Sequence, residues 1–490
     1  MIWGMEPLTP TQDTLQKTIS RENKPPDQTR AMIMPLFQYA ERKSPFSPIQ
    51  AETRPLYALT QSAAEKLPEN IRAFATAAGF GAREGECLLF PGAEGGLGGA
   101  LFGLGSGENP FVFGRLSKLL PAGDWRLEDH EGDATLALTA FAAGSYRFER
   151  YLKPAARSVR LAVPEGVAIA EIERVWAAIA LARDLVNTPA NDMQPDHLEE
   201  VFSALANHYQ ASFKSIRGDD LLPAGFPLVH AVGRAGEKAP RLMEMRWGRK
   251  GARLVTLVGK GVCFDTGGLD LKPSSGMALM KKDMGGAANV LALSLMIMDA
   301  GLDVDLRVII PSVENSVAGN AFRPGDIYRS RKGLTVQIDN TDAEGRLILA
   351  DALTYADEEL PDLLIDMATL TGAARVALGP DIAPFFTTSD EFAASLGEAG
   401  NRLGDPVWRM PLFAGYETKL KTGIADLTNA PAGGMAGAIT AALFLKQFVS
   451  RARSWAHFDI YAYAQNDRDF GPAGGEAQAI RAIFETIRKA

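Results

Sequence analysis

The feature that most constrains the fold is an alternation, from about residue 228 onward, of short apolar runs with longer segments of helical periodicity. Runs that are apolar throughout are typical of strands buried on both faces of a parallel sheet, with helices as connections. We therefore predict an α/β fold with a mixed, largely parallel sheet flanked by helices. The predicted strands are Leu228–Val232, Leu242–Trp247, Leu254–Val258, Val304–Ile310, Leu334–Ile338, Leu363–Met367 and His457–Tyr461, and the predicted helices include Ala287–Met298, Leu347–Glu358 and Ala438–Phe448.

The composition divides the chain into four parts. Residues 1–33 are polar, contain several prolines and lack a sustained apolar period, so we expect a mobile tail. Residues 34–165 show short apolar runs separated by Gly, Pro and Asp, which predicts a smaller N-terminal α/β domain. Apolar residues three and four apart predict a linker helix over residues 166–186, and residues 187–490 form the larger C-terminal domain.

A glycine-dense stretch, residues 92–107, follows the apolar run Cys87–Pro91. It contains neither of the two glycine-rich motifs that bind phosphate groups. Glycine also serves tight turns for purely conformational reasons. The favoured interpretation is therefore a loop or hairpin without a ligand.

Charge and composition exclude several classes of protein. The 51 basic and 59 acidic side chains give a formal net charge of −8, which disfavours nucleic acid as the main partner. The most apolar stretch, Ala287–Met298, is much shorter than the ~20 residues that cross a bilayer, so we expect no membrane association. The N-terminus resembles neither a secretory signal nor a transit peptide, and the two cysteines provide no disulfide framework. We expect a cytoplasmic protein.

Charged residues gather after the predicted strand Leu254–Val258, among glycines that let the backbone approach a ligand closely. They are Lys260, Asp265, Lys272 and Asp283. Ligands of α/β sheets bind beyond the carboxyl ends of the strands, where these residues are expected. Taken singly, each is more readily explained as an ordinary surface charge, but their coincidence between apolar flanks weakens that explanation.

A second cluster follows the predicted strand Leu334–Ile338 and contains Asp342, Glu344 and Arg346. The spacing of Thr341 and Glu344 also has the form of a capping box that opens the next helix, and spacing alone leaves both interpretations open. Four carboxylates brought together from the two clusters would repel one another unless cations neutralised them. Two divalent ions such as Mg²⁺, Mn²⁺ or Zn²⁺ would do so, since they accept oxygen ligands.

The two clusters carry a resemblance to a known family. Val258-Gly-Lys-Gly-Val-Cys-Phe-Asp-Thr-Gly-Gly268 and Asn340-Thr-Asp-Ala-Glu-Gly-Arg-Leu347 closely resemble motifs of the leucine aminopeptidase (cytosol aminopeptidase) family of two-metal peptidases. The resemblance covers about residues 165–485, and the eight-residue run is highly specific. It implies that residues 187–490 form a catalytic metallopeptidase domain.

The resemblance also implies a role for each matching position. The implied metal ligands are Lys260, Asp265, Asp283, Asp342 and Glu344, with Asp265 and Glu344 bridging two ions. Lys272 resembles the cation that stabilises the oxyanion, and Arg346 the residue that holds a bicarbonate ion as general base. Asp283 would also bind the substrate amine, with Met280 and Thr369 in the pocket for the first side chain.

The activity that the resemblance implies is removal of the N-terminal residue, Leu and other apolar residues preferred, by attack of a metal-bridging hydroxide. The implied cofactors are two divalent ions per subunit, Zn²⁺ or Mn²⁺ with Mg²⁺ as an alternative at one site, and the implied assembly is a homohexamer. A different carboxylate–metal hydrolase, such as a phosphoesterase, and a binding role like the DNA binding of some relatives are the alternatives. We expect His457 and Cys263 to be packed, structural side chains.

Overall fold

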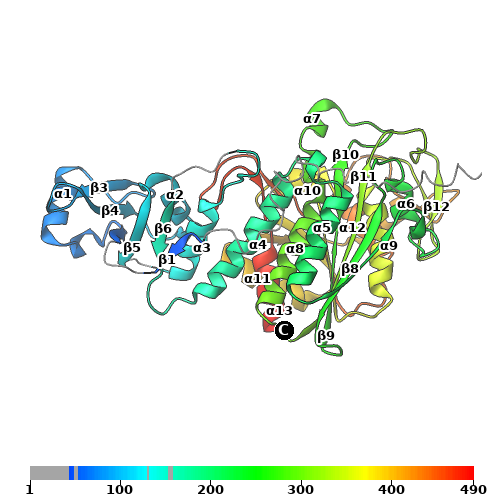
Figure 1. The fold of residues 1–490 in the computed structure, drawn as a ribbon. Helices are drawn as coiled ribbons and strands as arrows, with labels where there is room; N and C mark the ends of the chain where they lie inside the picture. Colours follow the sequence, from blue (N-terminus) through cyan, green and yellow to red (C-terminus); the bar gives the residue numbers. More distant parts are fainter. Residues whose placement is uncertain (1–43, 49–52, 130–131, 153–157) are drawn as a thin grey trace, which may run out of the picture.

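The computed structural model describes residues 44–48, 53–129, 132–152 and 158–490, so the predicted tail over residues 1–33 lies outside the described residues. Two domains lie side by side, a smaller N-terminal one and a larger C-terminal one, and helix α4 (Ile169–Asn187) lies between their sheets (Figure 1). Helix α4 corresponds to the predicted linker helix. The predicted domain limits themselves stay predictions.

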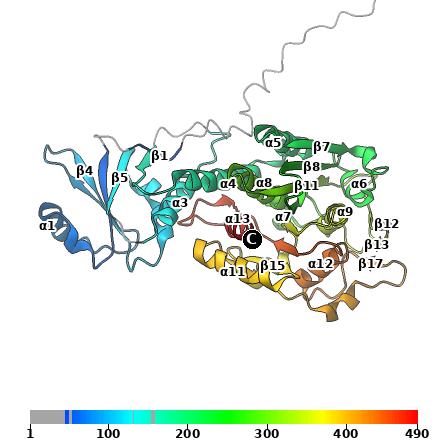
Figure 2. The ribbon, with the colours of Figure 1, turned by 90° about the horizontal axis from the view of Figure 1, so that it is seen from below.

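The N-terminal domain is built on a six-stranded sheet with strand order β1-β6-β5-β2-β4-β3. All neighbouring pairs are parallel except β4 and β3, which form an antiparallel hairpin at the glycine-dense stretch. Helices α1 and α3 pack with this sheet in the same domain (Figure 2). The bounds are β1 Phe46–Ser47, β2 Arg54–Leu59, β3 Cys87–Pro91, β4 Leu97–Gly103, β5 Gly123–Asp129, β6 Val159–Ala162, α1 Glu69–Ala77, α2 Leu116–Leu119 and α3 Ala134–Ser145.

The C-terminal domain contains a nine-stranded sheet with the order β16-β15-β18-β14-β9-β11-β8-β7, and β10 pairs with β11 off this path. The central strands β18, β14, β9 and β11 are parallel to one another, while β15 and β8 pair antiparallel with their inner neighbours. The mixed, largely parallel sheet is therefore confirmed. The bounds are β7 Ser212–Arg217, β8 Arg241–Gly248, β9 Arg253–Gly259, β10 Gly261–Asp265, β11 Val304–Asn315, β14 Leu363–Ala368, β15 Ala383–Thr387, β16 Val407–Arg409 and β18 Trp455–Asp459.

Helices cover both faces of this sheet (Figures 1 and 2). One hydrophobic core joins the sheet to α4, α5, α8, α11 and α13, and a second core joins the opposite face to α6, α9 and α12. The bounds are α5 Pro195–His208, α6 Pro227–Gly233, α7 Ser274–Met277, α8 Gly285–Asp299, α9 Gly345–Asp357, α10 Gly372–Leu378, α11 Asp390–Leu403, α12 Gly437–Lys446 and α13 Ile480–Lys489.

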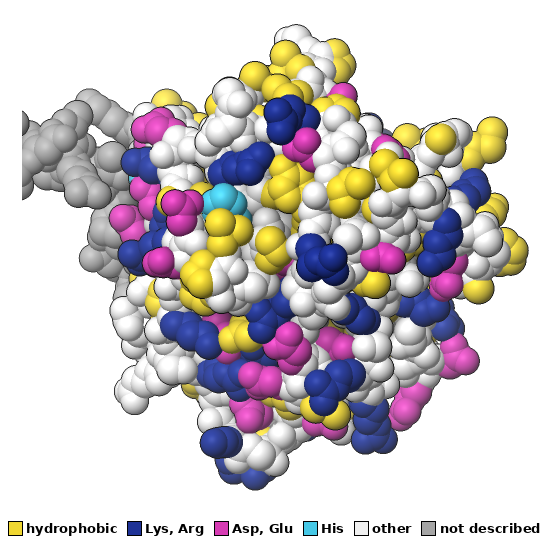
Figure 3. Space-filling model, turned by 90° about the vertical axis from the view of Figure 1, so that its right-hand side faces the viewer, with side chains coloured by type: hydrophobic (Ala, Val, Ile, Leu, Met, Phe, Trp, Pro, Cys, Tyr) yellow, Lys and Arg dark blue, Asp and Glu magenta, His cyan; other side chains and the backbone are white. Residues whose placement is uncertain are grey.

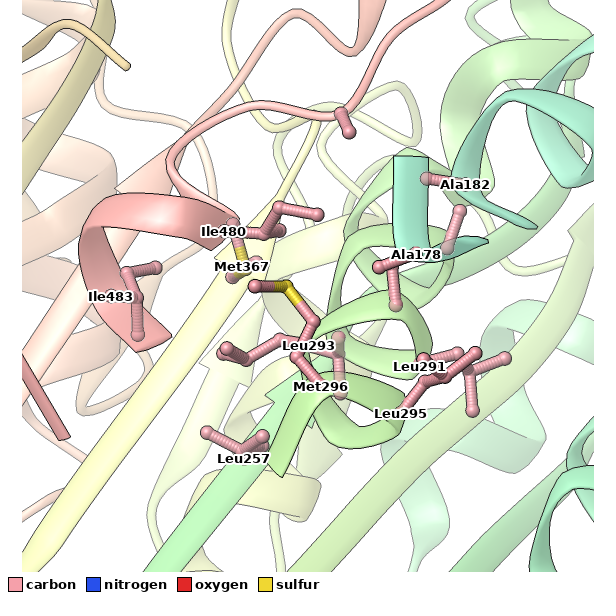
Figure 4. Packing of buried hydrophobic residues seen from close by; sticks show 14 of the residues in the cluster. Ala178, Ala182, Leu257, Leu291, Leu293, Leu295, Met296, Met367, Ile480 and Ile483 are labelled. Carbon is pink, nitrogen blue, oxygen red and sulfur yellow. The ribbon is translucent and has the colours of Figure 1, made fainter. Parts of the chain in front are cut away.

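Helix α8 shows why the sequence folds this way. Its residues from Gly285 to Met298 are all buried, because the helix is apolar around its whole circumference. In Figure 4, side chains of α8 such as Leu293 and Met296 meet Leu257 and Met367 of the sheet, with Ile480 of α13 beside them. A helix enclosed in this way fixes the strand ends that precede and follow it.

Two predicted strands differ in the structure. The segment Leu228–Val232 is helical, within α6, because Pro227 presets the first helical turn and the Asp351 carboxylate accepts hydrogen bonds from the Leu228 and Val229 amides. The segment Leu334–Ile338 contains β13, which belongs to a separate three-stranded sheet. The small elements are β12 Ile327–Arg329, β13 Thr335–Gln337, β17 Leu427–Thr428, β19 Tyr463–Ala464 and β20 Gly474–Gly475.

The surface carries mixed charge on the face in view in Figure 3, where basic and acidic side chains are interspersed. This face shows no continuous basic field of the kind that binds a polyanion. Within the described ranges, none of the helices has both the length and the apolarity needed to span a bilayer.

Candidate metal and peptide site

The two charged clusters of the sequence meet at the carboxyl end of the central strands. Lys260 lies between β9 and β10, and Asp265 is the last residue of β10. Asp283 lies in η8 (Met280–Met284), the 3₁₀ turn that leads into α8. Asp342 and Glu344 lie in the connection from β13 to α9, so they come from the small sheet rather than from a strand of the main one.

Three of the carboxylates converge directly. One oxygen from each of Asp265, Asp342 and Glu344 lies within 4.8 Å of the other two. Burial, and then the charge of Asp265, raises the pKa of Asp342 to about 6 and that of Glu344 to about 8. Burial likewise raises the pKa of Asp283, against the effect of Lys260. Burial and mutual repulsion therefore disfavour the charged forms of these carboxylates unless cations bind among them.

Lys260 lies at the centre of the cluster and is 3 % exposed. Its Nζ is 2.8 Å from Asp283 Oδ2 and 2.9 Å from Glu344 Oε1, and it donates a hydrogen bond to the Thr369 carbonyl. Burial lowers the pKa of this lysine, but the surrounding carboxylates outweigh burial and raise it above its usual value. Lys260 is thus the counter-ion of two carboxylates, and its sequence-predicted role as a metal ligand would require nearby dications to displace its proton.

Lys272 compensates the other side of the cluster. Its Nζ is 2.8 Å from Asp265 Oδ2 and also pairs with Asp342 Oδ1. Asp265 uses its second oxygen to accept hydrogen bonds from Asn315 Nδ2 and from the Gly267 amide. Since the Lys272 side chain is 15 % exposed and lines the adjacent cavity, it can face a bound substrate as well as the carboxylates.

A glycine lets the second cluster approach the first. A Cβ on Gly345, the first residue of α9, would lie 2.5 Å from Lys260 Cε and 2.6 Å from its Nζ. Any side chain at residue 345 would therefore displace either the end of Lys260 or α9. In both cases the close contact between the Lys260 ammonium and Glu344 would be lost.

The capping-box interpretation of Thr341 and Glu344 is wrong for the folded chain. The Thr341 hydroxyl donates to the Gly267 carbonyl at 2.6 Å and accepts from the Asp270 amide. It therefore links the segment after β10 to the segment before α9. Glu344 precedes α9 with no side-chain hydrogen bond to the helix start. The carboxylate of Glu344 is consequently free to point into the cluster.

The donor set fits divalent cations. Asp283 Oδ2, Asp342 Oδ1 and Glu344 Oε1 are buried, and apart from their ion pairs with Lys260 and Lys272 none of them accepts a hydrogen bond of good geometry from the described residues. Buried acceptors of this kind are costly unless something compensates them. Four carboxylates with two lysines leave oxygen ligands of the type that Mg²⁺, Mn²⁺ and Zn²⁺ accept.

A cavity of about 450 Å³ opens beside the carboxylates. It is lined by Lys260, Lys272, Asp283 and Asp342, and by three further sequence-predicted residues, Met280, Arg346 and Thr369. The Thr369 hydroxyl donates to Asp283 Oδ1 at 2.8 Å and so orients that carboxylate. All the sequence-predicted site residues are thus adjacent to, or part of, one cluster and one cavity.

Arg346 lies in the first turn of α9 and is 9 % exposed. Its Nη1 donates to the Asn429 carbonyl, while its buried Nε has no hydrogen-bond partner among the described residues. Burial lowers the pKa of the guanidinium to about 10. A small anion at Nε would compensate both the burial and the missing hydrogen bond.

Sequence reasoning missed residues that act from a distance. Asn315 holds Asp265, and the Asn429 side chain accepts from the Asp339 amide and donates to the Asn340 carbonyl, which shapes the second cluster. Nothing in the sequence marks these asparagines, because they lie 50 and about 90 positions from their partners. Lys282 and Tyr461 also line the cavity, and Lys282 could have been noticed as a second lysine directly before Asp283.

His457 and Cys263 are buried away from solvent. His457 Nδ1 is hydrogen-bonded to Asp366 on the neighbouring strand, and its ring stacks on Phe386. Burial raises the pKa of the Cys263 thiol to about 12, and the thiol lies near Ser312. Neither side chain belongs to the three-carboxylate group.

Comparison with known proteins decides the family. The model described as "Cytosol aminopeptidase family, catalytic domain" matches residues 180–484, and the one described as "M17 aminopeptidase, N-terminal domain" matches residues 56–164. The chain belongs to the cytosol aminopeptidase family. It therefore carries a peptidase catalytic domain, and the resemblance seen in the motifs is confirmed.

Individual relatives agree with this assignment. A cytosol aminopeptidase of Encephalitozoon cuniculi is 41 % identical over 313 residues, which is 63 % of this chain and 64 % of that protein. The crystal structure of cytosol aminopeptidase from Coxiella burnetii is 43 % identical, with a TM-score of 0.87, covering 91 % of this chain and 99 % of that one. The bottromycin maturation enzyme BotP in complex with Mn is 35 % identical, with a TM-score of 0.81, covering 90 % and 99 %.

Proposed function

We propose that the chain is a metal-dependent aminopeptidase that hydrolyses the N-terminal residue, Leu and other apolar residues preferred, from peptides with a free N-terminus. The observation that carries the proposal is the convergence of buried, poorly compensated carboxylates beside a cavity lined by Lys272, Met280 and Thr369. Membership of the cytosol aminopeptidase family supports the same reaction.

Asp265 and Glu344 would be shared between two ions. The full set of proposed metal ligands is Lys260, Asp265, Asp283, Asp342 and Glu344. Zn²⁺ or Mn²⁺ fits these ligands, with Mg²⁺ as an alternative at one site, and the Mn complex of BotP supports the choice of Mn²⁺. When bound, two such ions lower the pKa of water toward ~7 and so supply a nucleophile at neutral pH.

The chain's own residues would complete the reaction. The Asp283 carboxylate, oriented by Thr369, would accept a hydrogen bond from the substrate's α-amine. The proposed enzyme would therefore require a free N-terminus. The Lys272 ammonium would stabilise the negative charge that develops on the peptide carbonyl oxygen. Arg346, with its unpaired Nε, would hold a bicarbonate ion as the general base.

Met280 would form part of the wall of the pocket for the first side chain. Methionine is flexible and polarizable, so a pocket with such a wall adapts to several apolar side chains. We further propose a cytoplasmic location and a homohexameric assembly, both on the strength of the family resemblance.

The test compares three substrates in the presence and absence of a chelator. Leucine p-nitroanilide should be cleaved, its N-acetylated form should be cleaved at least about 100-fold more slowly, and p-nitrophenyl phosphate should not be cleaved. Chelation should abolish activity, and Mn²⁺ or Zn²⁺ should restore it. Equal rates on the acetylated substrate would exclude recognition of the amine, and preferential hydrolysis of the phosphate ester would favour a phosphoesterase.

A further inference from the structure

We propose that the cavity also accepts an acidic first residue, glutamate or aspartate, through a cationic subsite formed by Lys282 and Arg375. This inference rests on the proposed aminopeptidase function and names a class of substrate for the same site.

Lys282 is a buried cation that forms no ion pair within the part of the chain that the structure describes. It lies in η8 directly before Asp283, is 6 % exposed and lines the cavity. Its Nζ lies 4.6 Å from the centroid of the Tyr461 ring, and no hydrogen bond or ion pair joins it to another described residue. Lysine is almost never buried unless it is paired, so this ammonium is suited to pairing with a carboxylate of a bound ligand.

Arg375 adds a second cation on the same ring. It lies in α10, lines the cavity, and its guanidinium carbon is 5.3 Å from the Tyr461 centroid. The residue is exposed, and within the described ranges its guanidinium takes part in no hydrogen bond or ion pair. Two cations gathered at one aromatic side chain repel each other, and an anion between them relieves the repulsion.

The nearby carboxylate of Asp459 does not neutralise these cations by direct pairing. Its Oδ1 accepts hydrogen bonds from the Leu370 and Thr371 amides, and its Oδ2 accepts from the Thr371 hydroxyl at 2.6 Å. Asp459 is therefore occupied in holding the turn between β14 and α10. Lys282 and Arg375 therefore line the cavity as cations that Asp459 does not pair with directly.

The position of these cations points to the first side chain of the substrate. Lys282 is the neighbour of Asp283, which would bind the α-amine, and the first side chain branches from the carbon that carries this amine. The segments pack tightly here, because a Cβ on Gly285 would lie 2.5 Å from Ala462 Cβ and 2.9 Å from Thr369 Cγ2. Lys282, Tyr461 and Thr369 line the same cavity as Asp283, and the proposal places the first side chain among them.

The test compares isosteric charged and neutral first residues on the metal-loaded enzyme at pH 7. The p-nitroanilides of glutamate and glutamine, and of aspartate and asparagine, differ only in a carboxylate against a carboxamide. We expect the kcat/KM ratio of acid to amide to be above one, and Lys282→Met to lower this ratio at least about tenfold, as loss of a charge-assisted contact would. Lys282→Arg should keep the ratio within about threefold of the wild type.

A matched control removes a similar lysine elsewhere. Lys419 Nζ lies 4.7 Å from the centroid of the Tyr416 ring, outside the cavity lining. Lys419→Met should leave the acid-to-amide ratio unchanged. If Lys282→Met fails to fold, the exposed Arg375→Gln carries the comparison, and a fall in the ratio of at least about threefold supports the subsite.

The outcomes separate this inference from the proposed function. If leucine and glutamine substrates are cleaved but the acid-to-amide ratio is below one, or is unchanged in both Lys282→Met and Arg375→Gln, the acidic subsite is wrong and the aminopeptidase function stands. If no free-amine substrate is cleaved in a metal-dependent way, the proposed function itself fails.

Discussion

Two buried glutamates of the same domain have different electrostatic surroundings. Glu244 of β8 is 2 % exposed, and its oxygens contact Arg246, Arg307, Lys214 and the Tyr355 hydroxyl. Burial alone would raise its pKa, but these partners outweigh burial and lower the pKa to about 2. Glu344 is 1 % exposed among other carboxylates, and its pKa is raised to about 8.

The difference shows what distinguishes a structural charge network from a site. Every oxygen of Glu244 has a cation or hydroxyl partner within the protein, so the network is complete without a ligand. Glu344 Oε1 faces one cation, Lys260 at 2.9 Å, which it shares with Asp283, while the charges of Asp265, Asp283 and Asp342 act against its ionisation. Burial is shared by both glutamates; the sign of the surrounding charge decides their roles.

The largest expected effect is the loss of activity when Glu344 is removed. Glu344→Ala should lower kcat/KM for leucine p-nitroanilide at least about 10³-fold, because it removes a proposed bridging ligand at the reacting centre. Initial rates at saturating Mn²⁺ measure this. Glu398→Ala on α11, an exposed side chain, is the matched control and should be active. Full activity of Glu344→Ala would contradict the ligand assignment.

The reverse contrast is expected in stability. Glu244→Ala removes the closer carboxylate partner of the fully buried Arg307 guanidinium and leaves only Glu359 at 3.5 Å, and this should lower the free energy of unfolding by about 3–5 kcal/mol. Glu344→Ala in chelator should lower it little, because burial and the neighbouring carboxylates disfavour the charged form of Glu344 and Lys260 keeps its ion pair with Asp283. Urea denaturation followed by tryptophan fluorescence compares the variants. Equal losses in both would mean that the two networks are energetically alike.

A third test examines a lysine at the edge of the cluster. Lys272→Met should reduce kcat about 10²–10³-fold, the range seen when a donor to a developing oxyanion is removed. KM for leucine p-nitroanilide should change much less, since the interaction strengthens only in the transition state. Steady-state kinetics give both constants. A change in KM alone would place Lys272 in substrate binding instead.

The smallest expected effect is the pH dependence of the stabilisation that Glu244 provides. The pKa of Glu244 is lowered from its usual value of 4.5 to about 2, so its stabilising contribution is complete above pH 4.5 and is lost as pH falls toward 2. The difference in urea midpoint between wild type and Glu244→Gln should therefore shrink over this interval. A difference that stays constant from pH 6 to the acid limit would show that the Glu244 charge is not what Arg307 requires.

Much of the fold could be predicted because its determinants are local. Continuous apolar runs identified β8, β9, β11, β14 and β18, and the apolar circumference of α8 identified a helix enclosed by other elements. The predicted strand Leu228–Val232 is a helix in the structure, although its sequence is as apolar as the strands. A proline and a carboxylate 123 positions away from Leu228 decided that outcome, and neither effect is visible in apolar periodicity.

The candidate site could be predicted in its residues but not in its contacts. The motifs named the carboxylates and lysines, yet the capping box was an equally good explanation of Thr341 and Glu344. The structure excludes it, because Glu344 makes no side-chain hydrogen bond to the start of α9 and Thr341 donates to the Gly267 carbonyl, 74 positions away. The partner of Asp265, Asn315, and the cation Lys282 gained their meaning from neighbours that are distant in the sequence.

The sequence by itself determined the class of fold, the family and the residues able to bind cations, because apolar periodicity and side-chain chemistry are properties of the residues themselves. The tertiary structure decided which charges are compensated. Charge compensation depends on distances of a few ångströms between segments far apart in the chain, so the Glu244 and Glu344 side chains, chemically identical in the sequence, became a structural support and a proposed metal ligand.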